Sequence, residues 1–208
     1  MKILNLYAGI GGNRDLWGDE HDITAVEYHP GIAKVYQARY PKDKVIVTDA
    51  HQYLLDHIQD GWDFIWSSTP CPSHSRINTD GNHPPRYPDM KLYEEIILLD
   101  SHWFKGRYVV ENVIPYYKPL ILPSIEIDRH LFWKNFKTSR LIVEAAKPIA
   151  DQSGTEDRFG FNLKGIDVGG ANKRQVMRNL VNPEIGLHFL KCAQGIIEKS
   201  NSKQLSFA

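Results

Sequence analysis

The sequence has little of what builds disulfide-rich, zinc-binding or membrane-spanning proteins. Its 208 residues include two cysteines, Cys71 and Cys192, and no Cys-x-x-Cys pair, which excludes a disulfide scaffold and a zinc ribbon. No apolar run approaches the roughly 20 residues that a membrane-spanning helix needs. The first residues lack the charged, apolar and small-residue segments of a secretory signal. With two free cysteines, these absences predict a cytoplasmic protein that does not bind membranes.

The chain also lacks a net charge, because 25 basic side chains balance 25 acidic ones. The two halves differ, however. Residues 1–104 hold 9 basic and 15 acidic side chains, whereas residues 105–208 hold 16 and 10. The positive second half could face the phosphates of a nucleic acid, or the difference could be ordinary surface scatter.

Short apolar runs alternate with helical patterns through the first half of the chain. This alternation predicts an α/β fold, a doubly wound and mostly parallel sheet with helices on both faces. Strands are expected at residues 2–7, 23–28, 45–48, 63–68 and 108–113, and helices at 30–40, 50–58 and 89–104. The second half predicts a strand at 129–136, loop at 150–171 and a helix at 183–199. We expect one domain over residues 1–199 and a flexible tail at 200–208.

Ligands bind open parallel sheets at the carboxyl ends of the strands, and two of these ends suit a nucleoside. The turn Ala8–Gly12 (AGIGG) is neither a dinucleotide fingerprint, because Arg14 replaces the third glycine, nor a P-loop. Glu27 can accept hydrogen bonds from ribose hydroxyls, and Tyr28 can stack on adenine. Asp49, after the third strand, can reach the base. This order is typical of a site for S-adenosylmethionine, which has a ribose and an adenine but no phosphates.

Two further strand ends carry a thiol and a carboxyl group. Two prolines and polar neighbours place Cys71 in a loop beyond a strand, where a thiol is a candidate nucleophile. Glu111 ends the neighbouring strand and is expected to face the same pocket. Asn112 can hold loops by hydrogen bonds with backbone groups.

In combination, these motifs resemble those of the DNA (cytosine-5) methyltransferases. Residues 6–12 (LYAGIGG) are similar to the donor-binding first motif of the family, with tyrosine where phenylalanine is usual. Glu27-Tyr28 resembles its ribose-and-adenine pair, and Asp49 its acidic residue near the adenine amino group. Pro70-Cys71 is similar to its nucleophile motif, and Glu111-Asn112-Val113 to its Glu-Asn-Val motif. The resemblance covers about the first 113 residues.

The second half resembles the family at two further motifs. Arg129-His130-Leu131 is similar to an Arg-x-Arg motif that holds the target base, so either Arg129 fills the role or His130 replaces it. Residues 174–186 resemble the last motif, which closes the donor site, with Arg178-Asn179-Leu180 where the family has Gly-Asn-Ser. Residues 135–173 stand where the family has a larger target-recognition region. The resemblance therefore implies a compact, phage-like member that could need a partner or self-association to grip DNA.

The resemblance implies methyl transfer from S-adenosylmethionine to C5 of a flipped-out cytosine in DNA, without a metal. Cys71 would add to the ring, Glu111 would assist at N3 and the exocyclic amine, and Arg129 would hold O2 or a phosphate. Residues 73–88, with Arg76 and Arg86, are expected to form a mobile loop over the base. The implied donor-binding residues are Tyr7, Ala8, Gly9, Gly11, Gly12, Glu27, Tyr28, Asp49, Pro70 and Asn179. Further phosphate contacts are expected from Lys134, Lys137, Arg140, Lys173 and Arg174, or these side chains form a solvated face.

Three alternatives stay open at this stage. A zinc nucleobase deaminase is weakly suggested by Pro70-Cys71-x-x-His74, but a second cysteine and an upstream His-x-Glu are absent. An inactive nucleic-acid-binding relative is disfavoured by the intact Cys71 and Glu111. A tRNA cytosine-5 methyltransferase would carry the same motifs.

Overall fold

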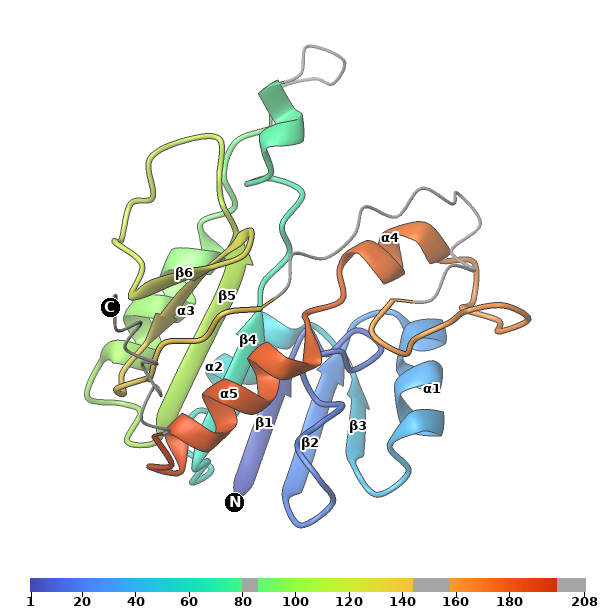
Figure 1. Ribbon diagram of the computed structural model, residues 1–208, viewed down its shortest axis with the longest axis horizontal. Helices are drawn as coiled ribbons and strands as arrows, with labels where there is room; N and C mark the ends of the chain where they lie inside the picture. Colours follow the sequence, from blue (N-terminus) through green and yellow to red (C-terminus); the bar gives the residue numbers. More distant parts are fainter. Residues whose placement is uncertain (80–85, 144–157, 198–208) are drawn as a thin grey trace, which may run out of the picture.

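The computed structural model of the protein describes residues 1–79, 86–143 and 158–197 (Figure 1). Within these ranges, seven strands form one sheet in the order β3-β2-β1-β4-β5-β7-β6. Strands β1 to β5 are parallel, and β7 is antiparallel to both of its neighbours. This arrangement confirms the predicted doubly wound, mostly parallel sheet. The predicted tail, 200–208, and residues 144–157 of the predicted recognition segment lie outside the described residues.

The described elements follow the predicted pattern closely in the first half. The strands are β1 (Lys2–Leu6), β2 (Asp22–Glu27), β3 (Lys44–Val47), β4 (Phe64–Ser68), β5 (Arg107–Val113), β6 (Ile125–Ile127) and β7 (His130–Lys134). The helices are α1 (Pro30–Arg39), α2 (Ala50–His57), α3 (Lys91–Asp100), α4 (Lys173–Arg178) and α5 (Pro183–Ala193), with a short 3-10 helix at Arg76–Thr79.

Three expectations about elements were wrong. The sequence predicted neither β6 nor α4, which have three and six residues and so show almost no periodicity. The last helix was expected to reach residue 199, but α5 ends at Ala193. Gly195 stops it, because its φ of +84° lets the N–H of Ile196 turn back to the carbonyl of Lys191.

Apolar side chains cover both faces of the sheet. On one face, Leu54 of α2 and Ile96 of α3 pack against Leu4 and Ile65 of the central strands. On the other face, Phe189 of α5 packs in one buried cluster with Trp66, Phe132 and other residues of the strands. Helix α1 lies on the same face as α5, beside β2 and β3 (Figure 1). Burial of each large apolar side chain contributes about 1.5–3 kcal/mol, so the two layers hold the carboxyl edge of the sheet in place.

A buried ion pair joins the turn after β1 to the loop after α1. Arg14 is 2% exposed, and its Nε and Nη2 donate to the two carboxylate oxygens of Asp43 at 2.8 and 3.0 Å. The hydroxyl of Tyr36 also donates to Asp43, at 2.8 Å. The residue that interrupts the glycine spacing therefore braces the turn.

Replacement of Asp43 by alanine is expected to lower the free energy of unfolding by about 3–5 kcal/mol, because it removes the buried carboxylate and leaves the buried Arg14 guanidinium with only the longer contact to the exposed Asp19. Urea unfolding followed by circular dichroism measures the loss. Asp19 provides the control, since it contacts the same arginine at 3.4 Å but its side chain is 63% exposed. Asp19→Ala should cost less than about 1 kcal/mol. Equal losses in the two variants would contradict this account.

Candidate active site

Three polar side chains meet at the carboxyl edge of the sheet because the strand register aligns them. Ser68 pairs with Glu111 across β4 and β5, and Val113 pairs with His130 across β5 and β7. Since side chains alternate along a strand, Ser68, Glu111 and His130 share the face that α5 covers. Glu111 is 6% exposed, and its Oε1 lies 3.6 Å from Nε2 of His130.

The protonation states of this group follow from burial. Burial raises the pKa of Glu111 to about 7, although a hydrogen bond from Ser68 and the charge of Arg129 act in the opposite direction. Burial, followed by the charges of Arg129 and Arg158, lowers the pKa of His130 to about 3. His130 is therefore neutral at pH 7, and its contact with Glu111 is not an ion pair. Glu111 can hold a proton near neutral pH, as a general acid must.

Hydrogen bonds from Asn112 of β5 fix the start of the loop that contains Cys71. Asn112 is 1% exposed, and its Nδ2 donates to the carbonyl oxygen of Thr69 at 3.0 Å and to its hydroxyl at 2.8 Å. The carbonyl oxygen of Cys71 accepts from the N–H groups of His74 and Ser75, both at 3.0 Å. Asn112 therefore holds the loop as the sequence led us to expect. In the predicted mobile loop, residues 80–85 lie outside the described residues.

The thiol of Cys71 shares an electrostatic environment with Glu111. Burial raises the pKa of Cys71, and the negative charge of Glu111 raises it further. The charges of Arg129 and Arg178 act in the opposite direction and favour the thiolate. The structure thus brings together Cys71, Glu111 and Arg129, the three residues predicted to be catalytic.

The start of the glycine-rich turn is open and lies next to a carboxylate. Gly9 has a φ of +57°, and a Cβ at this position would meet no atom within 4 Å. Its N–H donates to Oε2 of Glu27 at 3.0 Å, and the N–H of His29 donates to Oε1 at 2.9 Å. Each carboxylate oxygen keeps a lone pair for a ribose hydroxyl. The side chain of Tyr28 is 75% exposed beside it. The open space at Gly9, the acceptor oxygens of Glu27 and the aromatic ring of Tyr28 together suit an adenosine group.

The other two glycines of the turn make room for the protein itself. A Cβ on Gly11 would lie 2.3 Å from the ring of Tyr40, and one on Gly12 would lie 2.6 Å from the carbonyl oxygen of Val181. Ala8 is 5% exposed. Gly11 and Gly12 are therefore required by close packing, whereas Gly9 faces open space.

Tyr7 supports the turn from within the core. Its φ is +54°, and its hydroxyl donates to Oε1 of Glu95 at 2.6 Å. Glu95 is fully buried and also accepts from the hydroxyl of Ser67 at 2.6 Å, while Nδ1 of His51 lies 3.0 Å from Oε1. The hydrogen bond with Glu95 raises the pKa of His51, and burial raises that of Tyr7. The tyrosine hydroxyl therefore anchors a backbone conformation that non-glycine residues seldom adopt.

The remaining predicted donor residues lie around the same edge. Asp49 is the N-cap of α2, where its Oδ1 accepts from the N–H of Gln52 at 2.9 Å. That hydrogen bond is the main reason why the pKa of Asp49 is lowered. Pro70 and Asn179 are both exposed. The other carboxylate oxygen of Asp49, Oδ2, lies 3.6 Å from Nζ of Lys91.

The last motif closes onto the turn after β1. Nη2 of Arg129, in the β6–β7 turn, donates to the carbonyl oxygen of Arg178 at the end of α4, at 3.0 Å. Leu180 is 4% exposed and packs with Ile10 and Met177 in one apolar cluster. An apolar core position thus explains why leucine stands where the family has serine. In Figure 1, α4 lies beyond the carboxyl ends of β1 and β2.

Sequence reasoning missed two arginines and misplaced one lysine. Arg158 and Arg178 both affect this site electrostatically. The sequence alone does not reveal this, because both residues are far along the chain from β4 and β5. Lys134, expected to contact phosphate, pairs with Val109 near the start of β5, and so lies toward the opposite edge of the sheet from Cys71. Nζ of Lys173 donates to the carbonyl oxygen of Leu163 at 3.1 Å.

In residues 1–79, 86–143 and 158–197, no group of three or more His, Cys, Asp or Glu side chains is placed to hold a metal ion. None of the helices in this part of the chain has the length and apolar character needed to span a membrane.

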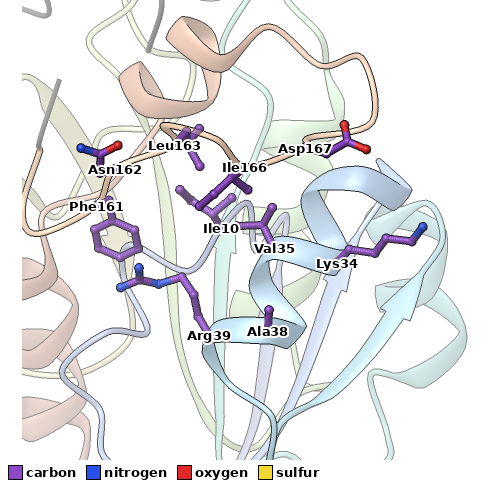
Figure 2. Close-up of a pocket in the computed structure, with 10 residues that line it drawn as sticks. All are labelled: Ile10, Lys34, Val35, Ala38, Arg39, Phe161, Asn162, Leu163, Ile166 and Asp167. Carbon is purple, nitrogen blue, oxygen red and sulfur yellow. The ribbon is translucent and has the colours of Figure 1, made fainter. Parts of the chain in front are cut away.

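A separate cavity of about 350 Å³ lies between α1 and residues 161–167 (Figure 2). Ile10, Val35, Leu163 and Ile166 give it an apolar wall, while Cζ of Arg39 lies 3.8 Å from the ring centroid of Phe161. None of the residues predicted to bind donor or base lines it. The cavity is therefore not the site formed around Cys71.

Comparison with known proteins links the first half of the chain to one family. Residues 1–97 match the family model described as C-5 cytosine-specific DNA methylase. No curated protein sequence matches the chain. Among solved structures, the chain is similar to a mutant DNMT2 of Spodoptera frugiperda, with 27% identity over 54% of this chain and 35% of that one and a TM-score of 0.37. It is also similar to the Dnmt2 methyltransferase of S. pombe, with 22% identity, coverages of 54% and 34%, and a TM-score of 0.40.

A third similar structure is a DNA modification methyltransferase from a prophage of E. coli, with 16% identity, coverages of 57% and 33%, and a TM-score of 0.37. The matched region spans about a third of the length of each of these three solved proteins. The sheet of this chain is of the Rossmann-like type expected for an S-adenosylmethionine-dependent methyltransferase.

Proposed function

We propose, because residues 1–97 match the family model described as C-5 cytosine-specific DNA methylase, that the protein transfers a methyl group from S-adenosylmethionine to C5 of cytosine in DNA. One observation carries the proposal. The thiol of Cys71 and the protonatable carboxyl group of Glu111 interact electrostatically at the carboxyl edge of the sheet, which also carries the open turn at Gly9. The proposed substrate is DNA in the cytoplasm, and self-association of the protein is one way in which it could bind that DNA.

Donor binding would fall to the open end of the turn. Glu27 would accept the ribose hydroxyls while the N–H groups of Gly9 and His29 hold its carboxylate in place. Tyr28 would stack on the adenine. When bound, S-adenosylmethionine supplies an electrophilic methyl group on its sulfonium.

The target base would be activated by the residues around Cys71. C5 of cytosine is a poor nucleophile, and addition of the Cys71 thiolate to C6 gives C5 the electron pair that it needs. Glu111, in its protonated form, would give its proton to N3 as the ring accepts negative charge. Arg129 would hold O2 of the base or the phosphate beside it. After the methyl group reaches C5, a base removes the C5 proton, and the electron pair of that C–H bond re-forms the ring double bond as the thiolate leaves and N3 returns its proton to Glu111.

Incubation with methyl-labelled S-adenosylmethionine and either unmodified DNA or tRNA, followed by nucleoside analysis, tests this function. We expect 5-methylcytosine in the DNA sample. Label in tRNA alone would replace DNA by tRNA as the substrate. Label on another base atom, or on neither polymer, would contradict the proposal, and the absence of label would favour a relative that binds nucleic acid without catalysis.

A further inference from the structure

Three arginines from separate parts of the chain converge beside the proposed catalytic pocket. Arg129 comes from the β6–β7 turn, Arg178 from the end of α4 and Arg158 from a tight turn before residue 162. The hydrogen bond from Arg129 to the carbonyl oxygen of Arg178, at 3.0 Å, joins two of them directly. The charges of both act on Arg158, and those of Arg129 and Arg178 act on Cys71.

Arg158 is held in place more firmly than a surface arginine. Its N–H donates to the carbonyl oxygen of Phe161, and the N–H of Phe161 donates back, both at 2.9 Å. The two residues between them have φ values of +54° and +77°, as a tight two-residue turn requires. Cζ of Arg158 lies 5.1 Å from the ring centroid of Phe159. The turn fixes the backbone of Arg158, and the ring of Phe159 lies against the guanidinium end of its side chain.

Arg158 is also buried, and most of the charges that act on it are positive. It is 8% exposed, and within the described part of the chain no hydrogen bond reaches its Nε. Among the described residues, Asp128 stabilises its charge, while Arg129 and Arg178 both oppose it. A buried cation among like charges is costly unless an anion balances it. The described part of this cluster therefore favours binding of an anion.

We propose that Arg158, together with Arg129 and Arg178, binds a backbone phosphate of DNA next to the cytosine that reaches Cys71. The inference rests on the proposed function and adds the group that seats the flipped nucleotide. A phosphodiester fits because guanidinium groups bind phosphate oxygens through paired, charge-assisted hydrogen bonds. Phosphate contacts of this kind set register and orientation rather than sequence preference.

The cluster also accounts for a departure in the sequence. The Arg-x-Arg motif of the resemblance has Leu131 at its second arginine, and Leu131 is 3% exposed in the core. That position supplies no charge at the site. Arg178, where the family has glycine, and Arg158 bring two guanidinium groups to the pocket from other segments.

The experiment measures binding of the whole protein to a fluorescent 30-base-pair DNA duplex over a range of salt concentrations, with S-adenosylhomocysteine present. Arg158→Gln should weaken binding about tenfold and reduce the slope of log K against log salt by about 0.9, the value for one phosphate contact. Arg158→Lys should retain most of the slope. Arg107→Gln is the matched control, because Arg107 is exposed at the start of β5, and it should leave the slope unchanged.

Other results separate this inference from the proposed function. Calorimetric titration with S-adenosylhomocysteine should give the same affinity for wild type and Arg158→Gln, which shows that the variant is folded. An unchanged slope in a folded variant, or a change on tRNA but not on the duplex, would overturn the phosphate site, as would a failure of the wild type to bind DNA. If the slope changes but no label enters DNA, the phosphate site stands and the proposed reaction fails.

Discussion

Cys71→Ala is expected to bind the methyl donor normally and to lose methyl transfer by at least about 10⁴-fold, because the substitution removes the nucleophile proposed to add to C6 of the base. The proposed donor contacts come from the turn after β1, from Glu27 and Tyr28 and from other backbone and side-chain groups, and none of them uses the thiol of Cys71. Filter-binding assays with labelled donor measure transfer, and calorimetry with S-adenosylhomocysteine measures donor binding. The two readouts distinguish loss of the nucleophile from loss of the fold.

The chain provides its own control for this variant. Cys192 is buried in α5, where its sulfur lies 3.9 Å from Nε2 of His188, and it has no place in the proposed mechanism. Cys192→Ala removes the same thiol chemistry and should retain transfer. Wild-type activity in Cys71→Ala would show that the covalent mechanism is wrong, whatever the control does.

A covalent adduct can also be observed directly. DNA carrying 5-fluorocytosine has no proton to lose at C5 after methyl transfer, so the bond between the sulfur of Cys71 and C6 should persist. A slow-migrating protein–DNA band should form in the wild type and in Cys192→Ala, and not in Cys71→Ala. Absence of the band from the wild type, with methyl transfer intact, would indicate a route without an adduct.

The sequence predicts the first half of the fold well because the signals there are local. Apolar runs such as those of β1 and β4, bounded by turns, specify buried strands whatever surrounds them. The second half depends on contacts between distant segments. β6 is too short to show a period, and it forms because its residues pair with Leu131 and its neighbours in β7.

The residues of the candidate site also fall into two groups, those with a local sequence signal and those without one. Cys71, Glu111 and Asn112 could be found from the sequence because they end adjacent parallel strands, whose carboxyl ends share one edge. The sequence also marks the glycines after β1, but it does not reveal that Gly9 faces open space while Gly11 and Gly12 face Tyr40 and Val181. Arg158 left no local signal, because the charges of Arg129 and Arg178 that act on it come from distant parts of the chain.

The pH dependence of kcat/KM should show the two protonation states that the mechanism needs. Cys71 must lose a proton, and its pKa is raised, while Glu111 must keep one, and its pKa is about 7. Below pH 7, Glu111 stays protonated and the thiolate fraction grows about tenfold per pH unit, so the rate should rise with a slope of one. Above pH 7, loss of the Glu111 proton cancels the gain in thiolate. We therefore expect the profile to level off at about pH 7.

Glu111→Gln should lower kcat/KM by about 10²–10⁴-fold, because an amide cannot give a proton to N3. The bend at pH 7 should also disappear, and the remaining rate should keep rising with pH until the thiol ionises. Glu126→Gln is the control, since it removes the same charge from an exposed position on β6 and should keep both the rate and the bend. A bend near pH 7 that persists in Glu111→Gln would assign it to another group.

The same substitution should stabilise the protein at high pH, which separates its chemical role from a structural one. Burial raises the pKa of Glu111 from 4.5 to about 7, so the folded state favours the protonated form. Its contribution to stability is present below pH 4.5 and is lost as the pH rises through 7. Glu111→Gln keeps a neutral group there, and at pH 8 its free energy of unfolding should exceed that of the wild type by up to about 3 kcal/mol. Urea unfolding at pH 5 and pH 8 measures this difference. A higher free energy of unfolding at pH 8 together with lost activity is expected only if the carboxyl group serves the reaction at the expense of stability.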